Sequence, residues 1–340
     1  MAKRVVLAVA GAGKTKLIID QLELDSRALI ITYTINNTLN IKRRIIDKFG
    51  FIPKGVRVYT YFSFLMSFCI RPVVGNSIKV KGISYSIPIL GTKRKTKDHY
   101  LIKGRLYHNR MAKLLTDYPS LIDGVTRRIE KYFDFVCVDE VQDFAANDFN
   151  LLCALSNLNA EMLLVGDFYQ HTFDTSRDGP IKKNLHKNYD KYLNEFRNAS
   201  FEVDLVSLSR SYRCSPTICN FVNDSLGIPI TSTRTDGVNI EFVTDKNEIH
   251  ELMSDNAIAK LFYQGSNKYI GWTDNWGNTK GLDDFQDICV VLNKTSFSEY
   301  KKGTLSNLAV SSLNKLYVAC TRTKGNLFFV AEDQLKAYKK

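Results

Sequence analysis

Short apolar segments with the composition of buried β-strands alternate with helical patterns along the first half of the sequence. These segments cover residues 5–9, 28–33, 56–60, 133–138 and 162–165. The stretch TKLIIDQLEL, between the first two segments, has the apolar spacing of a helix. Strands that alternate with helices form parallel sheets with helices on both faces. The sequence therefore predicts an α/β fold built on a parallel sheet.

The strand-like segments resume after a polar, loop-like stretch, TSRDGPIKKNLHKN, which begins at Thr175. Five further segments follow it between residues 201 and 331: FEVDLVSL, VNIEFV, YIGW, DICVVL and NLFFVA. A chain of 340 residues is long enough for two domains of about 100 to 200 residues each. We expect a first α/β domain at residues 1–180 and a second at residues 181–340.

Composition places the protein among soluble globular chains, with 44% hydrophobic and 24% charged residues. No apolar run approaches the roughly 20 residues of a membrane-spanning helix. The seven cysteines lie mostly in apolar stretches and never form a Cys-x-x-Cys pair, so zinc sites and a disulfide framework are not expected. This use of cysteine fits a reducing compartment, and we predict a cytoplasmic location with no membrane partner.

The net charge of +12 is concentrated in one segment, residues 71–113. This segment interrupts the alternation of strands and helices, so we expect an insertion carried by the first domain. It holds a single acid, Asp98, and three interleaved tyrosines, Tyr85, Tyr100 and Tyr107. Its eleven basic residues are Arg71, Lys79, Lys81, Lys93, Arg94, Lys95, Lys97, Lys103, Arg105, Arg110 and Lys113. An ordinary solvated face is the alternative, but basic and aromatic residues together favour a nucleic-acid-binding surface.

The stretch FVCVDEVQDF, residues 135–144, is an apolar strand that ends abruptly in acids. Asp139, Glu140 and Asp143 would lie at the carboxyl end of this strand, the edge of a parallel sheet where ligands bind. Clustered carboxylates repel one another unless a cation lies between them, which suggests Mg²⁺. A solvated turn with Asp143 near a helix cap is the alternative.

The stretch AVAGAGKTK, residues 8–16, follows the first strand and precedes the first helix. This order is that of a P-loop, although Ala8 stands where the pattern has glycine. Backbone N–H groups of the residues Ala10, Gly11, Ala12 and Gly13 would surround phosphate oxygens. Lys14 would reach the terminal phosphates, and Thr15 would offer its hydroxyl to Mg²⁺. A purely structural glycine turn is the alternative.

A nucleotide loop also explains the acidic strand end. Asp139 would hold Mg²⁺ through water, and Glu140 would orient or deprotonate the attacking water beside the γ-phosphate.

The pair AVAGAGKT and VDEVQD resembles the superfamily 1 helicases of the UvrD, Rep and PcrA type, and further motifs match in the order of that family. The stretch LLVGDFYQHTF resembles the motif whose glutamine, here Gln170, senses the γ-phosphate. In LSRSYRCSPTICNFV the resemblance implies that Tyr212 stacks on the base of ATP and that Arg213 contacts the γ-phosphate. In LYVACTRTKGNLFFV it implies that Arg322 is an arginine finger that reaches across the cleft between the domains.

Three more stretches extend the resemblance. NWGNTKGLDDFQDICVVL resembles the motif near the ribose, which implies roles for Gly281 and for Asp283, where the family usually has Glu. ITYTINNTLNIKRRI and VYTYFSF resemble motifs that contact single-stranded DNA. The family also has a base-stacking tryptophan that QHTFDTSRDG lacks, which leaves Phe173, or Tyr169, in its place. The implied nucleic-acid contacts are Thr32, Thr34, Asn36, Thr60, Phe62, Ser63 and Phe173.

The resemblance implies an ATP-dependent DNA helicase or translocase with two RecA-like P-loop NTPase domains, which hydrolyses Mg-ATP at their cleft and moves on single-stranded DNA or RNA. Only about sixty residues separate SYR from NTKG, so the large accessory domain of the family is expected to be absent. An alternative is an ATP-dependent switch subunit that licenses a partner nuclease in a phage or anti-phage system, or serves a replication or repair protein. The missing tryptophan and accessory domain favour the switch. The basic insertion and TYTINN favour the motor.

Overall fold

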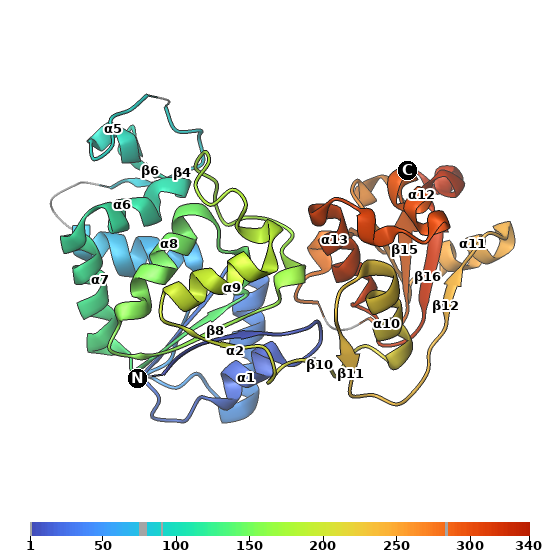
Figure 1. The fold of residues 1–340 in the computed structure, drawn as a ribbon, viewed down its shortest axis with the longest axis horizontal. Coiled ribbons are helices and arrows are strands. Elements are labelled where there is room, and N and C mark those ends of the chain that lie inside the picture. The colour runs from blue at the N-terminus through green and yellow to red at the C-terminus, as the bar shows by residue number, and fades with distance from the viewer. Residues whose placement is uncertain (1, 75–79, 90, 283–284) are drawn as a thin grey trace. The chain divides into compact units, whose positions relative to one another are not determined.

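The computed structural model describes residues 2–74, 80–89, 91–282 and 285–340, which form two compact units (Figure 1). Unit 1 comprises Met1–Val6, Thr15–Gly166 and Phe173–Asp204. Unit 2 comprises Leu7–Lys14, Asp167–Thr172 and Leu205–Lys340. The glycine loop and the segment that carries Gln170 therefore pack with unit 2, although the strands before them belong to the sheet of unit 1.

Unit 1 is built on a six-stranded sheet with the order β3-β2-β7-β8-β1-β9. Its strands are β1 (Lys3–Leu7), β2 (Ala28–Thr32), β3 (Arg57–Thr60), β7 (Phe135–Asp139), β8 (Glu161–Gly166) and β9 (Glu202–Asp204). The pairs β2–β3, β2–β7, β7–β8 and β1–β9 are parallel. All five residues of β2 are buried, as expected for a strand covered on both faces. The five predicted strands and the α/β class are confirmed.

Helices connect these strands. They are α1 (Lys14–Asp20), α2 (Ile35–Phe49), α3 (Tyr61–Ser63), α4 (Arg71–Val74), α5 (Lys97–Tyr100), α6 (Met111–Asp117), α7 (Pro119–Tyr132), α8 (Ala146–Ala154) and α9 (Tyr189–Asn198). A π-helix, Phe64–Ile70, joins α3 to α4. The helix α2 is preceded by a capping threonine, Thr34, and followed by Gly50, whose left-handed backbone (φ 81°) is typical of a helix C-terminus.

The predicted boundary after residue 180 falls inside unit 1. The segment FEVDLVSL, predicted as part of the second domain, instead supplies β9, which pairs with β1 through Arg4 opposite Glu202 and Val6 opposite Asp204. The helix α9 before it buries Tyr192 and Phe196 against Phe149. The first sheet is complete only with this strand, so unit 1 extends to Asp204. A strand's partner is chosen by pairing across the sheet, which its own composition does not reveal.

The predicted insertion is a small substructure of unit 1. Its strands β4 (Gly82–Ser84), β5 (Leu101–Ile102) and β6 (Arg105–Tyr107) form a separate three-stranded sheet with the order β4-β6-β5. Figure 1 shows this sheet and α5 at upper left, beyond α6. The insertion therefore adds a surface to unit 1 without entering its main sheet.

Unit 2 contains a five-stranded sheet with the order β12-β16-β15-β13-β14, and its four strand pairings are all parallel. Its strands are β12 (Ile240–Phe242), β13 (Ala259–Phe262), β14 (Thr273–Asn275), β15 (Ile288–Leu292) and β16 (Leu327–Ala331), and β10 (Arg210–Ser211) pairs with β11 (Thr231–Ser232) beside it. Its helices are α10 (Pro216–Phe221), α11 (Lys246–Ser254), α12 (Lys294–Lys302) and α13 (Val310–Cys320), with a π-helix at Val222–Leu226.

Side chains of β15 alternate between two cores. Ile288 and Val290 pack in the core that contains residues of α10 and α13, whereas Cys289 and Val291 pack in the core that contains residues of α11. The strand β13 was not predicted, because Lys260 interrupts its apolar run. The Lys260 side chain is nevertheless buried, and its ammonium group donates to the backbone carbonyl of Asp255.

Among the residues that the structure describes, no helix is both long enough and apolar enough to span a membrane. The seven cysteines are free thiols, and all except Cys153 are buried.

Candidate functional site

The phosphate loop, residues 8–13, connects β1 to α1. Gly11 (φ 71°) and Gly13 (φ 90°) adopt left-handed backbone conformations that favour glycine. A Cβ atom at Gly11 would lie 2.6 Å from Cβ of Arg213, and the Tyr212 backbone N–H donates to the Gly11 carbonyl at 2.9 Å. Glycine is therefore required at position 11 for two reasons. Its backbone angle is left-handed, and the segment that carries Arg213 approaches too closely for a side chain.

A series of hydrogen bonds within unit 2 links the phosphate loop to Gln170 and Arg322. The Ala10 backbone N–H donates to Oη of Tyr317 at 2.9 Å, and Tyr317 Oη donates to Oδ2 of Asp167 at 3.1 Å. Gln170 Nε2 donates to the same carboxylate oxygen at 2.9 Å. Arg322 Nη2 donates to Gln170 Oε1 at 3.3 Å. Three chain segments that are distant in sequence thus form one network, hereafter the relay.

Burial keeps the Tyr317 phenol of the relay protonated. Desolvation, with the nearby Asp167 carboxylate as a second cause, raises the pKa of the Tyr317 phenol well above its usual value. Tyr317 therefore remains a hydrogen-bond donor at neutral pH. Gln170 and Asp167 are each 1% exposed, so the relay hydrogen bonds form in a setting of low dielectric constant where they are strong.

Arg322 is held by more than Gln170. The side chain is 2% exposed, and its guanidinium donates to the backbone carbonyls of Val318, Thr279 and Leu282 at 3.2 to 3.4 Å. The planar guanidinium is thus fixed in orientation before any ligand binds.

The other two nucleotide residues of unit 2 differ in exposure. Arg213 Nη1 donates to the Thr321 carbonyl at 3.1 Å, which brings Arg213 next to the turn that carries Arg322. The ring of Tyr212 is 68% exposed, so a face is open to a planar ligand. Gly281 has a left-handed backbone (φ 81°). Asp283 lies outside the described residues.

The acids at the end of β7 are buried in unit 1. Asp139 and Glu140 are 4% and 5% exposed, which does not fit a solvated turn. Glu140 has a left-handed backbone (φ 57°), and its N–H donates to Asp139 Oδ1 at 3.0 Å. Gln142 Nε2 donates to Glu140 Oε2 at 2.7 Å. Buried carboxylates held in a strained turn are a common feature of functional sites.

Five aromatic rings of unit 1 meet near the carboxyl ends of β2 and β3. Ring centroids of Tyr33 and Phe173 lie 5.2 Å apart, and those of Tyr33 and Phe62 lie 6.0 Å apart. Phe62 also contacts Tyr85 and His108, at 6.3 and 6.4 Å. We call these five residues the aromatic cluster. It brings two of the predicted residues, Phe62 and Phe173, together with Tyr85 of the insertion.

Tyr33 and His108 were not named as site residues from sequence. Tyr33 lies inside the stretch TYTINN, and its position directly after a buried strand was the signal that could have identified it.

The polar residues predicted to contact nucleic acid lie around the aromatic cluster with different exposures. Thr32 is fully buried, so the surface after β2 is formed by Tyr33, Thr34 and Asn36 instead. The Thr34 hydroxyl accepts from the Asn37 backbone N–H at 3.1 Å as the cap of α2. Thr32 is therefore the predicted contact that the structure does not place on this surface.

Thr60 and Ser63 form a similar local pair at the start of α3. The Thr60 hydroxyl donates to the Ser63 hydroxyl at 2.8 Å. Ser63 is exposed and Thr60 is half-buried, so both remain at the surface beside Phe62.

The insertion presents fewer of its residues to solvent than its sequence suggests. Tyr100 and Tyr107 are buried, and only Tyr85, 70% exposed, remains of the three interleaved tyrosines. Arg110 is buried beside Asp178 at 3.4 Å, and Lys113 pairs with Asp117 at 3.9 Å. The interleaved pattern was wrong for these residues, because they build the small core of the insertion.

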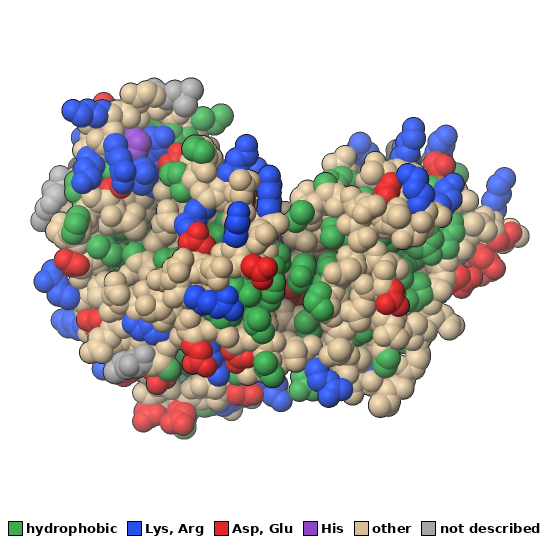
Figure 2. Space-filling model, viewed as in Figure 1, with side chains coloured by type: hydrophobic (Ala, Val, Ile, Leu, Met, Phe, Trp, Pro, Cys, Tyr) green, Lys and Arg blue, Asp and Glu red, His purple; other side chains and the backbone are tan. Residues whose placement is uncertain are grey.

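Eight basic residues of the insertion remain exposed, and Figure 2 shows Lys and Arg side chains gathered over this part of unit 1. They are Arg71, Lys81, Lys93, Arg94, Lys95, Lys97, Lys103 and Arg105. Lys79 lies outside the described residues.

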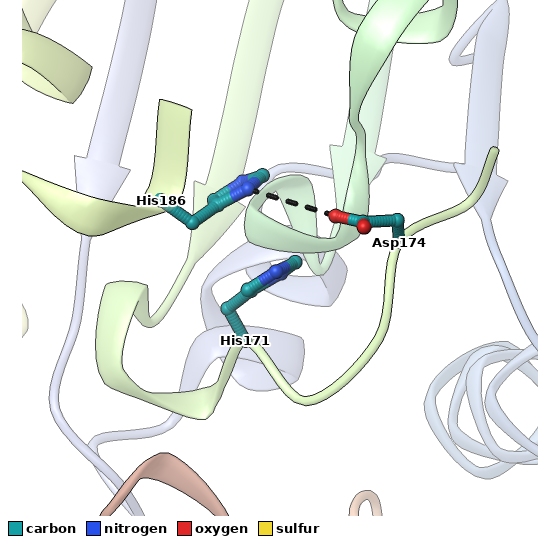
Figure 3. Close-up of side chains that lie close together, drawn as sticks. All are labelled: His171, Asp174 and His186. Carbon is teal, nitrogen blue, oxygen red and sulfur yellow. Dashed lines mark ion pairs between the residues drawn. The ribbon is translucent and has the colours of Figure 1, made fainter. Parts of the chain in front are cut away.

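The segment that follows Phe173 is held by ion pairs within unit 1. His186 Nδ1 lies 3.8 Å from Asp174 Oδ1 (Figure 3), and Arg177 pairs with the second oxygen of the same carboxylate. Asp174 therefore ties the segment after Phe173 to the short helix Leu185–Lys187.

Asp148 of α8 also holds the segment that follows Phe173. Its carboxylate accepts from the hydroxyls of Tyr61 and Thr175, each at 2.8 Å, and from Ser176 at 2.5 Å. Burial raises the pKa of Asp148 to about 6 although all three donors favour its charged form.

This raised pKa gives an expected pH dependence. The folded protein holds the Asp148 proton at pH values where the unfolded carboxyl has lost it, so the free energy of unfolding should fall as pH rises from about 4 to 6. The contribution of Asp148 is on the order of 3 kcal/mol. Urea unfolding across this range should show a shallower fall for Asp148→Asn than for the wild type. Equal slopes of the unfolding free energy against pH in the two proteins would contradict the raised pKa of Asp148.

Comparisons with known proteins bear on the fold. No protein-family model matches the sequence, and no curated protein matches it. Arterivirus nonstructural protein 10, a helicase, is similar in structure both in complex with DNA and alone, each with a TM-score of 0.52 and 14% identity over 99% of this chain. The structure of the PRRSV helicase matches with a TM-score of 0.49 and 13% identity.

The chain spans 63% and 62% of the two arterivirus structures and 54% of the PRRSV helicase. At this level of identity the likeness concerns the fold alone. The two parallel-sheet α/β units of this chain have the fold seen in the two structures of arterivirus nonstructural protein 10.

Proposed function

We propose that this chain is an ATP-dependent helicase or translocase of superfamily 1, of the UvrD-like type, which hydrolyses Mg-ATP and moves on single-stranded nucleic acid. The observation that carries the proposal is the relay, because it joins the phosphate loop to a glutamine and an arginine suited to a terminal phosphate. The helicase fold and the half-buried rings of the aromatic cluster support it. A phosphate loop alone would serve many nucleotide enzymes equally well.

The residues present fit a magnesium nucleotide. Gly11 and Gly13 give the loop the backbone freedom to turn N–H groups toward phosphate oxygens, and Lys14 follows directly. The Thr15 hydroxyl and the buried Asp139 carboxylate offer the hard oxygen ligands that Mg²⁺ prefers. When bound, the ion would neutralise charge on the phosphate oxygens. Glu140, a buried carboxylate beside Asp139, would orient and deprotonate the attacking water.

The hydrogen bond between Gln170 and Arg322 would depend on whether a terminal phosphate is bound. The phosphate oxygens would compete with Gln170 Oε1 for the Arg322 guanidinium, because a charged acceptor forms the stronger hydrogen bond. The Gln170 amide, freed from Arg322, remains tied through Asp167 and Tyr317 to the Ala10 backbone. Occupancy of the loop and the position of Arg322 are then coupled through the relay. Arg213 would add a second cation to the same phosphate.

The aromatic cluster would stack on bases of a single strand, while exposed lysines and arginines of the insertion would contact phosphates. Base stacking on one aromatic ring contributes about 1 to 3 kcal/mol, so Phe62→Ala should weaken binding of an oligothymidylate by about 5-fold to 150-fold. Fluorescence anisotropy with a labelled strand measures this. Phe51→Ala, which removes an exposed ring of unit 1 outside the cluster, should leave affinity unchanged. Equal losses of affinity in both variants would show that the single-stranded DNA does not bind at the aromatic cluster.

The decisive experiment is steady-state ATP hydrolysis with and without single-stranded DNA of increasing length, at low and moderate salt. Stimulation that grows with strand length and then levels off is expected for a translocase, and salt should weaken it because phosphate contacts release counterions. Absence of stimulation at low salt would refute the motor. If hydrolysis then still requires Lys14, the switch subunit that serves a partner nuclease becomes the better description.

A further inference from the structure

A cavity of about 610 Å³ opens in unit 1, at the edge of the main sheet where β2, β3 and β7 begin. It is lined by residues just before β2, β3 and β7, such as Arg27, Gly55 and Phe133, and by Arg128 and Tyr132 of α7. These three strands are parallel to one another, and Asp139 lies at the far end of β7. A five-residue strand spans about 16 Å, so within unit 1 the cavity is separate from the acids that follow β7 and from the aromatic cluster.

The lining of the cavity is strongly cationic. Arg27, Lys54, Arg57 and Arg128 line it together with one acid, Asp25. Arg27 has its own partners, since it donates to the last carbonyls of α7 at Lys131 and Tyr132 and pairs with Asp134 at 3.4 Å. Within the described part of the chain, Arg57 donates only to backbone carbonyls, those of Lys54 and Val56.

The Arg128 side chain retains a hydrogen-bond donor that the described residues leave unsatisfied. Its Nε atom is buried and has no hydrogen-bond partner among the described residues. Its guanidinium lies 4.8 Å from the ring centroid of Phe68 and 5.2 Å from that of Tyr132, which fixes its plane by cation–π contact. A guanidinium that is oriented on aromatic rings and lacks a carboxylate is suited to bind a phosphate through paired hydrogen bonds.

Aromatic rings complete the cavity. Tyr59, Phe68, Tyr132 and Phe133 line it, and Tyr132 is 43% exposed. The cavity volume lies within the range of about 300 to 1,000 Å³ that is typical of small-molecule sites. Cations without carboxylate partners beside an exposed tyrosine match a ligand that carries both a phosphate and a planar ring.

We propose that this cavity is a second nucleotide-binding site, in which Arg128, Arg57 and Lys54 bind the phosphate and the tyrosine rings contact the base. The ligand is either a free mononucleotide or one nucleotide of a single strand, and the experiment below distinguishes the two. The proposal does not rest on the function proposed above, because none of these residues belongs to the phosphate loop, the relay or the aromatic cluster.

The test is isothermal titration of AMP, inorganic phosphate and a short oligothymidylate into full-length protein that carries Lys14→Ala, which silences the phosphate loop. AMP or the oligonucleotide should bind, and Arg128→Gln or Arg57→Gln should weaken that binding about tenfold or more, the effect of removing a charged hydrogen bond. Binding of AMP identifies a free nucleotide as the source. Binding of the oligonucleotide that Arg128→Gln weakens, without binding of AMP, identifies the strand. Oligonucleotide binding that neither arginine variant weakens belongs to the aromatic cluster and would overturn the proposal.

The matched control is Arg127→Gln, which removes the same charge from the adjacent, exposed position of α7. It should leave affinity unchanged. Equal losses for Arg127→Gln and Arg128→Gln would overturn the proposal, since net charge alone would then explain binding. Inorganic phosphate that binds as tightly as AMP would also overturn it, because the rings would contribute nothing. Absence of all binding would do the same. Thermal unfolding checks that Arg128→Gln folds, and Arg57→Gln tests the site independently of α7.

Discussion

Arg322→Ala is expected to lower the turnover number of ATP hydrolysis by about 10³-fold to 10⁵-fold, the effect of losing an arginine that stabilises a transferring phosphoryl group. The affinity for ATP should change little, because the guanidinium is needed mainly where charge develops in the transition state. Steady-state hydrolysis gives the turnover number, and a fluorescent nucleotide gives the affinity. Both are measured on the same preparation.

The buried position of Arg322 requires a structural control. Alanine would remove the guanidinium hydrogen bonds to the carbonyls of Val318, Thr279 and Leu282, of which the first two keep a second donor. A lost buried hydrogen bond costs about 1 to 3 kcal/mol. Gln170→Ala keeps Arg322 and those three contacts but removes its link to the relay. It should lower turnover, and because it also removes the Gln170 hydrogen bond to Asp167, the free energy of unfolding is measured for both variants. Wild-type turnover in a well-folded Arg322→Ala protein would show that the arginine finger is misassigned.

Lys14→Ala is expected to lower the turnover number by at least about 10²-fold to 10³-fold, the cost of removing one positioned cation or donor from a developing charge. Affinity for ATP should fall as well, because the ammonium would contact the terminal phosphates already in the ground state. Lys14 is the first residue of α1, directly after Gly13, and its side chain is half-buried. Hydrolysis and nucleotide binding are both measured.

Lys16→Ala is the matched control for Lys14. It removes the same charge two residues further along α1, from an exposed position. Its hydrolysis should equal that of the wild type. Near-normal turnover in Lys14→Ala, or equal losses in the two variants, would contradict the assignment of the phosphate loop.

Local patterns in the sequence were sufficient for much of the fold. Apolar runs predicted β2, β7 and β15, since strands buried on both faces need nearly continuous apolar residues. The same reasoning missed β13, where Lys260 is buried within the strand. It also placed β9 in the wrong sheet, because the choice between β1 and a strand of unit 2 depends on pairing across the sheet.

Residue types at strand ends similarly predicted the candidate chemistry but not the contacts. Glycines with left-handed backbone angles and acids after a buried strand are local features, readable from spacing. The relay joins Ala10, Tyr317, Gln170 and Arg322 through hydrogen bonds between segments up to three hundred positions apart, and Tyr317 had no local signal. Such bonds depend on where folded elements meet.

Sequence alone was therefore enough for the α/β class, the glycine loop, the acidic strand end and the position of the insertion, because each depends on residue type and spacing within one segment. The burial of Tyr100, Tyr107 and Thr32 became visible only in the folded structure. The same is true of the five rings of the aromatic cluster and of the cationic cavity that Arg128 lines. These properties arise from packing between distant segments. Burial and contact are set by the whole fold, whereas spacing along the chain records only the neighbours of each residue.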